Sequence, residues 1–347
     1  MTPAAWTLLL LCAGAPGTRL ELTPGQWSHN DVVYAHGSLW LAVEATVWRY
    51  GADGVGESHT LPDGAHARQL FPRGGTVDLH LDYEVARITG ESLNRIVGFD
   101  ESVTSYRRVA AIGDGYAALS LSGELTYHRG RGGAVVIRPE TCTEAEEELS
   151  CRPVEPPLRL RGGTLVSVAD DRLGWVRDNP YEILTFGLDG RVRVLRTEPE
   201  SPLAREAAAY TPDGAKRPMV RTRRVVAAAG RLFVSRIVYD LVRMEDDSEF
   251  AGLTVLRPTA YLDVITVPDG ELVKRAELLR GDEEESLGVL VGLRDPDTVV
   301  LLAGDFRRDA DGKPIGADAD PLTGPPGWRS WLRFVKWRDL PDRPPPG

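Results

Sequence analysis

The chain has 347 residues, a formal net charge of −10 and a pI near 5.2. Hydrophobic residues make up 42% of it and charged residues 27%, a globular composition that excludes wholesale disorder. The acidic balance, with no Lys- or Arg-rich run, predicts that the protein does not bind nucleic acid.

An apolar run opens the chain and predicts a signal peptide over residues 1–17. The run is shorter than the roughly 20 residues that span a bilayer, so no transmembrane span is predicted. We expect export to the periplasm, the cell envelope or the outside of a bacterial cell. A buried first strand is the alternative. Cys12 is a candidate for lipidation, although Leu11 stands where a bacterial lipobox has glycine or alanine.

Short apolar and β-branched segments, separated by Gly, Asp-Gly and Pro-Asp-Gly, follow one another along most of the chain. Alternation of this kind, bounded by turn residues, is typical of strands, and little of the sequence repeats at helical spacing. The sequence therefore predicts an all-β protein. Modules of this kind fall at residues 31–50, 75–99, 108–127, 163–195, 224–267 and 287–337.

About six such modules, each of roughly 30 to 60 residues, resemble the blades of six-bladed β-propellers of the TolB-like and NHL-like kind. The resemblance covers residues 30–340 and rests on one order: apolar strand, Gly, apolar strand ending in an aromatic residue, then Asp-Gly. It implies a single β-propeller domain over residues 18–340, with seven blades or a pair of β-sandwiches as alternatives. Residues 19–22 are expected to complete the ring by pairing with residues 331–337, which would hide the sheet edges.

Four stretches interrupt this rhythm and are predicted insertions, where binding often resides, although solvated decoration is the alternative. They are residues 139–157, 197–218, 239–258 and 305–328. Residues 203–210 and 144–149 are predicted as short helices. Residues 341–347 are predicted to be a disordered, proline-rich tail.

Cys142 and Cys151 form an even pair once Cys12 is removed or lipidated. In an oxidising compartment we expect them to form a local disulfide. Two free thiols in the cytosol are the alternative. Neither cysteine has a second Cys or His at zinc spacing, so no zinc site is predicted.

Asp78, His80, Asp82 and Glu84 alternate with apolar residues and would share one face of a strand. Alternate positions on a strand are about 7 Å apart, too far for one cation, so we interpret this as a solvent-facing strand. Residues 309–320 are similar to a calcium loop but lack its closing glutamate, and are interpreted as a hairpin tip.

No motif of a zinc protease, serine hydrolase, phosphate loop or dinucleotide site is present, so no catalytic or metal residues are predicted. Arg217, Arg221, Arg223 and Arg224 form a basic patch that could bind an anionic ligand. In a chain with 51 acidic residues, salt bridges to neighbours are the expected use.

Two functions fit these patterns. The first is a monomeric, non-catalytic propeller that binds a small molecule or a partner protein and needs no cofactor. The alternative is a calcium-dependent propeller hydrolase or lactonase, with one ion held in a central channel by side chains from different blades. The candidate calcium ligands are Asp31, Asn94, Asp178, Asn179 and Asp263.

Overall fold

The structure is a computed structural model and describes residues 18–23, 31–62, 65–73, 75–81, 83–89, 92–99, 108–120, 124–130, 134–137, 140–145, 148–153, 163–177, 181–198, 220–243, 254–280, 288–306 and 328–342. Apart from the 3₁₀ turn η3 (Trp337–Asp339), the regular elements of these residues are strands. The predicted all-β class is therefore confirmed. Among the described residues, no helix is long and apolar enough to cross a membrane.

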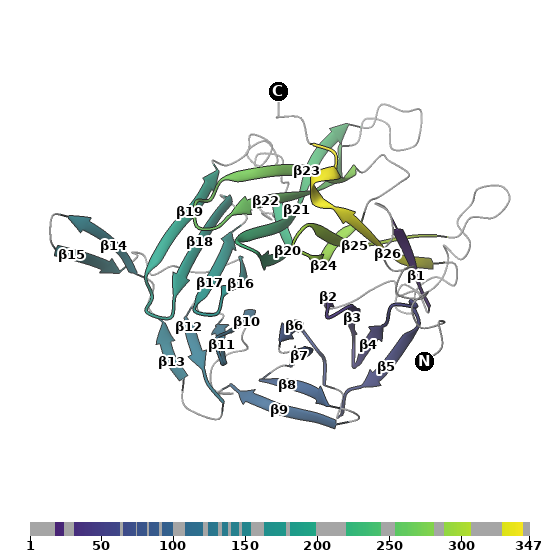
Figure 1. Cartoon of the computed structure of the whole chain (residues 1–347), viewed down its shortest axis with the longest axis horizontal. Helices are drawn as coiled ribbons and strands as arrows, with labels where there is room; N and C mark the ends of the chain where they lie inside the picture. Colours follow the sequence, from purple (N-terminus) through teal and green to yellow (C-terminus); the bar gives the residue numbers. More distant parts are fainter. Residues whose placement is uncertain are drawn as a thin grey trace, which may run out of the picture. The chain divides into compact units, whose positions relative to one another are not determined.

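The chain divides into two compact units, one of Met1–Arg95 with Ser286–Leu340 and one of Ile96–Glu285 with Pro341–Gly347. In the first unit, two antiparallel meanders follow each other along the chain (Figure 1). One contains β2 (Asp31–Ala35), β3 (Ser38–Val43), β4 (Thr46–Tyr50) and β5 (Gly56–Thr60). The other contains β6 (Gln69–Arg73), β7 (Thr76–His80), β8 (Glu84–Thr89) and β9 (Ser92–Gly98), the last of which runs past the unit boundary.

The two ends of the chain meet in the same unit. There β24 (Val289–Asp295), β25 (Thr298–Phe306), β26 (Trp328–Lys336) and the N-terminal β1 (Thr18–Leu22) lie in sequence. β1 pairs with β26, with Thr18 opposite Phe334 and Leu22 opposite Ser330. The predicted pairing of residues 19–22 with the C-terminal module is thus confirmed. These strands join β2–β5 in one eight-stranded sheet through a parallel pairing of β2 and β24 at one position, Tyr34 opposite Gly292.

The second unit holds three four-stranded antiparallel meanders and a separate two-stranded hairpin (Figure 1). The first contains β10 (Arg108–Ile112), β11 (Gly115–Leu119), β12 (Leu125–His128) and β13 (Ala134–Ile137). The second contains β16 (Thr164–Ala169), β17 (Arg172–Arg177), β18 (Tyr181–Gly187) and β19 (Val192–Glu198). The third contains β20 (Val220–Ala228), β21 (Arg231–Arg243), β22 (Thr254–Thr266) and β23 (Leu272–Arg280). The hairpin is β14 (Glu140–Ala145) with β15 (Glu148–Pro153).

Within each unit, successive sheets are arranged as in a β-propeller. The first strands of neighbouring sheets lie next to one another, β24 beside β2 and β2 beside β6 in one unit, β10 beside β16 and β16 beside β20 in the other. Apolar clusters fill the space between neighbouring sheets, for example Leu119, Leu125 and Trp175 between the β10–β13 and β16–β19 sheets. Burying each large apolar side chain contributes about 1.5–3 kcal/mol, so these layers stabilise each unit.

Tight turns account for the short connections between strands. His36 and Gly37, between β2 and β3, both have positive φ angles (52° and 75°), and so do Ala229 and Gly230 between β20 and β21 (48° and 69°). Two successive positive φ angles define the type I′ turn, whose twist matches that of the flanking strands. The glycine signals in the sequence therefore do mark hairpins.

Strands extend into the predicted insertions. The predicted helix at residues 144–149 is wrong, because these residues belong to the β14–β15 hairpin, where Glu144 pairs with Leu149. Backbone pairing across the hairpin overrides the helix propensity of glutamate there. β21 and β22 continue as a paired ladder to Arg243 opposite Thr254, inside the predicted insertion at residues 239–258. The predicted helix at residues 203–210 and the predicted tip at residues 309–320 lie outside the described residues.

Candidate functional site

The β20–β23 sheet is basic although the whole chain is acidic. Its four strands carry ten arginines and lysines against three carboxylates, while the chain has a net charge of −10. The neighbouring β16–β19 sheet carries four arginines against two glutamates. Charge of one sign concentrated on one element raises the local potential and attracts ligands of the opposite sign.

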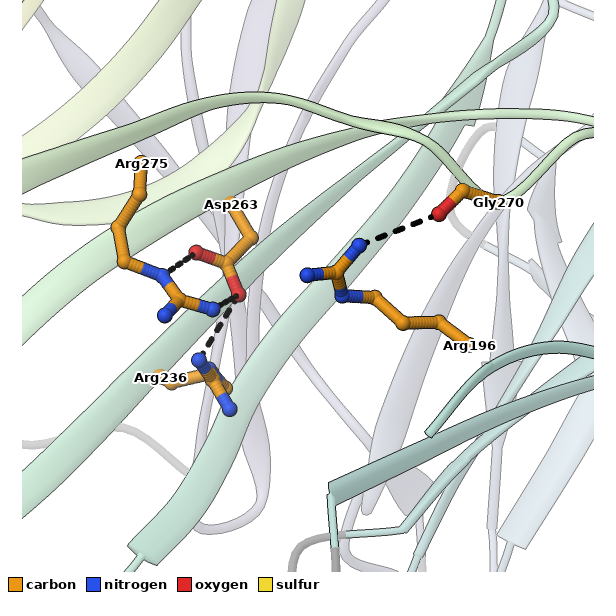
Figure 2. Close-up of polar contacts among 5 residues, drawn as sticks. All are labelled: Arg196, Arg236, Asp263, Gly270 and Arg275. Carbon is orange, nitrogen blue, oxygen red and sulfur yellow. Dashed lines mark hydrogen bonds and ion pairs between the residues drawn. The ribbon is translucent and has the colours of Figure 1, made fainter. Parts of the chain in front are cut away.

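Asp263 lies on β22, an inner strand of this sheet, where two guanidinium groups bind it (Figure 2). Arg275 on β23 donates from Nε to Oδ1 at 2.7 Å and from Nη2 to Oδ2 at 3.0 Å, a bidentate pair. The Nη2 of Arg236 on β21 lies 2.9 Å from Oδ2. The exposed fractions of the three side chains are 0% for Asp263, 3% for Arg236 and 22% for Arg275.

Two tyrosine rings hold Arg236 in place. Its guanidinium carbon lies 3.6 Å from the ring centroid of Tyr181 on β18 and 4.6 Å from that of Tyr261 on β22. Planar contact of this kind suits the weakly hydrated guanidinium and adds about 1–2 kcal/mol per desolvated contact. Arg236 therefore ties the basic sheet to the β16–β19 sheet beside it.

Strand register and burial explain this cluster. Asp263 stands opposite Val234 and Arg275 in the ladder, so their side chains share the sheet face that also carries Leu232 and Ile265. Residues of that face pack with Val176 and Ile183 of the β16–β19 sheet. A carboxylate buried there needs opposite charge to offset its desolvation, and the two arginines supply it.

The turn between β22 and β23 also contacts the neighbouring sheet. Arg196 on β19 donates from Nη1 to the Gly270 carbonyl at 3.3 Å (Figure 2). Gly270 has φ +73°, and a Cβ there would overlap the carbonyl oxygen of Leu195. Only glycine fits this close approach of the turn to β19.

Among the described residues, none of the predicted calcium ligands belongs to a group of metal-binding side chains. Both carboxylate oxygens of Asp263 face guanidinium groups, which excludes this residue as a cation ligand as it stands. Asp31 accepts the Leu70 backbone N–H through Oδ2 at 2.8 Å, and Asn94 is exposed on β9. Asp178 and Asn179 lie outside the described residues. Within the described part of the chain, no three His, Cys, Asp or Glu side chains are grouped to hold a metal.

The interpretation of residues 78–84 as a solvent-facing strand is wrong. Asp78 and His80 on β7 are buried, with exposed fractions of 0% and 1%, and so are Val77 and Leu79 on the other face. Arg87 on β8 stands opposite Asp78 and bonds to both of its carboxylate oxygens, which offsets the cost of burial. Glu84 pairs with Arg95 at 3.1 Å, and Asp82 lies outside the described residues.

A buried hydroxyl and imidazole on β12 have the spacing of a nucleophile and its base. Thr126 Oγ1 lies 2.9 Å from His128 Nε2, and the same hydroxyl donates to the Ala118 carbonyl at 3.3 Å. Because a hydroxyl has one hydrogen, the shared proton comes from Nε2, and His128 is the donor. Burial lowers the pKa of His128, which keeps the imidazole neutral. We interpret the pair as a structural contact.

The other predicted site residues have these positions. Arg221, Arg223 and Arg224 lie on β20, where Arg223 is exposed, and Arg217 lies outside the described residues. Cys142 on β14 stands directly opposite Cys151 on β15. Cys12 lies outside the described residues.

Sequence reasoning missed Arg236, Arg275 and the basic sheet. The ten basic residues are spread over about 60 positions, and only the three arginines of β20, part of the basic patch named from the sequence, stand close together along the chain. Pairing β20 with β21, and β22 with β23, gathers them. A count of charge per predicted module, rather than per run, would have revealed the basic sheet.

No family model matches the sequence, and no curated protein matches it. Similar solved structures include YCF48 bound to D1 peptide, with 12% identity and a TM-score of 0.41 over 95% of this chain and 98% of that one. A luciferin-regenerating enzyme has 10% identity and a TM-score of 0.44 over 94% and 97% of the two chains. The Neurospora crassa Pan2 WD40 domain has 10% identity and a TM-score of 0.41 over 90% of each chain. The propeller-like assignment rests on the strands and sheets described above.

Proposed function

We propose that this protein is a non-catalytic β-propeller that binds an acidic segment of a partner protein on its β20–β23 sheet. The observation that carries the proposal is the charge of that sheet, ten basic residues against three acidic ones in a chain of net charge −10. A local basic surface raises the association rate of an acidic partner and fixes where it docks.

An acidic polypeptide fits this charge distribution better than a nucleic acid. A nucleic acid carries phosphate charges along its whole length, and those beyond the basic sheet would be repelled by the acidic remainder of the protein. A short acidic segment can contact the basic sheet alone. Arginine side chains also match carboxylates through paired N–H donors.

The buried polar groups support a binding role rather than catalysis. Asp263 and Asp78, the buried carboxylates among the described residues, are each held by arginine. A catalytic carboxylate or a calcium ligand needs a lone pair aimed at substrate or ion. The calcium-dependent hydrolase therefore loses Asp263 from its ligand set, and no contact among the described residues favours it.

We further propose six blades in one propeller domain, of the kind seen in TolB-like and NHL-like proteins. The eight-stranded sheet divides at the parallel pairing of β2 with β24, Tyr34 opposite Gly292, into β24–β25–β26–β1 and β2–β5. Each half is then an antiparallel sheet of four strands, like the other four four-stranded sheets. β1 would complete the last blade, as expected of a ring closed by both chain ends.

Export of a monomer to the periplasm or beyond remains our proposal for the location of the protein, with residues 1–17 as its leader. The measurement that tests it is the intact mass of the protein recovered from cells. A mass that lacks residues 1–17 supports export. An added lipid mass on Cys12 would instead indicate an exported protein anchored to the membrane. The mass of an unprocessed chain would contradict both.

Titration with fluorescein-labelled poly-L-glutamate, followed by anisotropy, tests the binding function. We expect binding that weakens with salt, and a loss of up to about fivefold for Arg223→Glu at low salt, since one exposed charge pair is worth about 0.2–1 kcal/mol. Arg193→Glu, an exposed position on β19 of the next sheet, is the matched control. Equal losses for both variants, or tighter binding of a single-stranded DNA oligonucleotide, would contradict the proposal.

A further inference from the structure

The outer edge of the basic sheet is already occupied by a short piece of the chain itself. β23 is the last strand in the order β20–β21–β22–β23. On its open side, Asp342 forms an antiparallel bridge with Ala276, and the Glu277 backbone N–H donates to the Pro341 carbonyl at 3.2 Å. The edge of β23 therefore accepts an extended segment through main-chain hydrogen bonds.

The same segment brings a carboxylate to a largely buried lysine. Lys274 Nζ lies 2.9 Å from Asp342 Oδ1, and the exposed fractions of the two side chains are 11% and 80%. A buried ammonium group is costly unless an opposite charge lies close to it. Asp342, an exposed residue, supplies an opposite charge at this lysine.

The described tail residues, Pro341 and Asp342, pair with a small part of this edge. β23 spans Leu272–Arg280, while the bridge and the hydrogen bond involve Ala276 and Glu277. Val273, beside Lys274, has an exposed fraction of 45%. The strand carries three basic residues and one acidic one. A longer segment could pair along more of β23 and keep a carboxylate at Lys274.

We propose that the outer edge of β23 is the docking site for an extended acidic segment of the partner protein, and that Pro341 and Asp342 occupy it as a self-ligand in the free protein. The partner segment adds as an antiparallel strand beside β23 and replaces the Asp342 carboxylate at Lys274. This inference rests on the proposed function and specifies which part of the basic sheet takes the partner. Strand addition gives affinity through the main chain and specificity through alternate side chains.

The self-ligand sets a threshold for binding. A tethered segment competes at an effective concentration in the millimolar range, so a partner must form more contacts than the tail to displace it. Removing the tail should therefore strengthen the binding of an acidic strand, and removing the Lys274 charge should cancel that gain.

The test uses a labelled peptide of alternating valine and glutamate, titrated into the full chain and into a chain ending at Leu340. We expect the shortened chain to bind at least about threefold more tightly, and Asp342→Asn in the full chain to give part of this gain. Lys274→Gln in the shortened chain should abolish it. The same peptide methylated on alternate backbone nitrogens should bind weakly to every variant, because it cannot complete the ladder.

Two results would overturn the inference: an unchanged or weaker affinity after removal of the tail, or a gain that persists with Lys274→Gln or with the methylated peptide. If the shortened chain does not fold, the Asp342→Asn comparison decides the matter in the full chain. Failure here is distinguishable from failure of the binding function, because the response of poly-L-glutamate binding to Arg223→Glu does not depend on the tail.

Discussion

Replacing Asp263 by asparagine should destabilise the second unit strongly. The substitution keeps the shape of the side chain but removes the charge that three hydrogen bonds or ion-pair contacts of 2.7–3.0 Å engage. It takes the Asp263 charge away from Arg236, which is 3% exposed in an apolar layer. Removing one partner of a buried pair costs about 3–5 kcal/mol. For a unit of this size that corresponds to a loss of roughly 6–20 °C in Tm.

Urea unfolding followed by tryptophan fluorescence measures this loss. The matched control is Asp297→Asn, which breaks an exposed pair with Arg338, the side chains being 52% and 57% exposed, and should cost at most about 1 kcal/mol. A triple variant with Asp263→Leu, Arg236→Met and Arg275→Leu should recover much of the stability lost by Asp263→Asn, because it leaves no unpaired charge. Equal losses for Asp263→Asn and Asp297→Asn would refute the reasoning.

Three further predictions concern the turns, pH and the cysteines. Gly270→Ala should destabilise the protein by several kcal/mol, because the Cβ of the new alanine would overlap the Leu195 carbonyl. Gly37 has a similar φ but open space around it, so Gly37→Ala should cost about 1–2 kcal/mol in the same urea assay. Burial lowers the pKa of His128, so the unfolded chain binds more protons than the folded one, and stability should fall as the pH drops below about 6.5. In thermal melts, His128→Gln should reduce this pH dependence. An unchanged pH profile would contradict the prediction. Non-reducing peptide mapping should find Cys142 linked to Cys151, because directly opposed residues of a ladder have the Cα separation a disulfide requires; two free thiols in exported protein would contradict this.

Strand positions were predictable because their signals are local. The alternation and turn residues at residues 31–50 appear in the structure as β2, β3 and β4, with the turn at His36 and Gly37. Pairing of residues 19–22 with the C-terminal strand was also predictable, because the open edge of a sheet and an unpaired terminal strand both have backbone N–H and C=O groups that need partners.

The candidate site could not be predicted in the same way, because it depends on register. Asp263 and Arg275 are 12 residues apart, and Asp263 and Arg236 are 27 apart, so only the pairing of β21, β22 and β23 brings them together. Burial was misjudged for the same reason. Asp78 looks like a solvent-facing residue until β8 places Arg87 opposite it. A buried charge is identified by its partner, and its partner lies on another strand.

Hydrogen–deuterium exchange of the full chain with and without the alternating valine–glutamate peptide shows whether the basic sheet is the binding surface. We expect slower exchange of backbone amides in Leu272–Arg280 and in neighbouring strands of the β20–β23 sheet, with little change in β10–β13. Protection confined to other sheets, or no protection at a peptide concentration that saturates the anisotropy signal, would show that the basic sheet is not the binding surface.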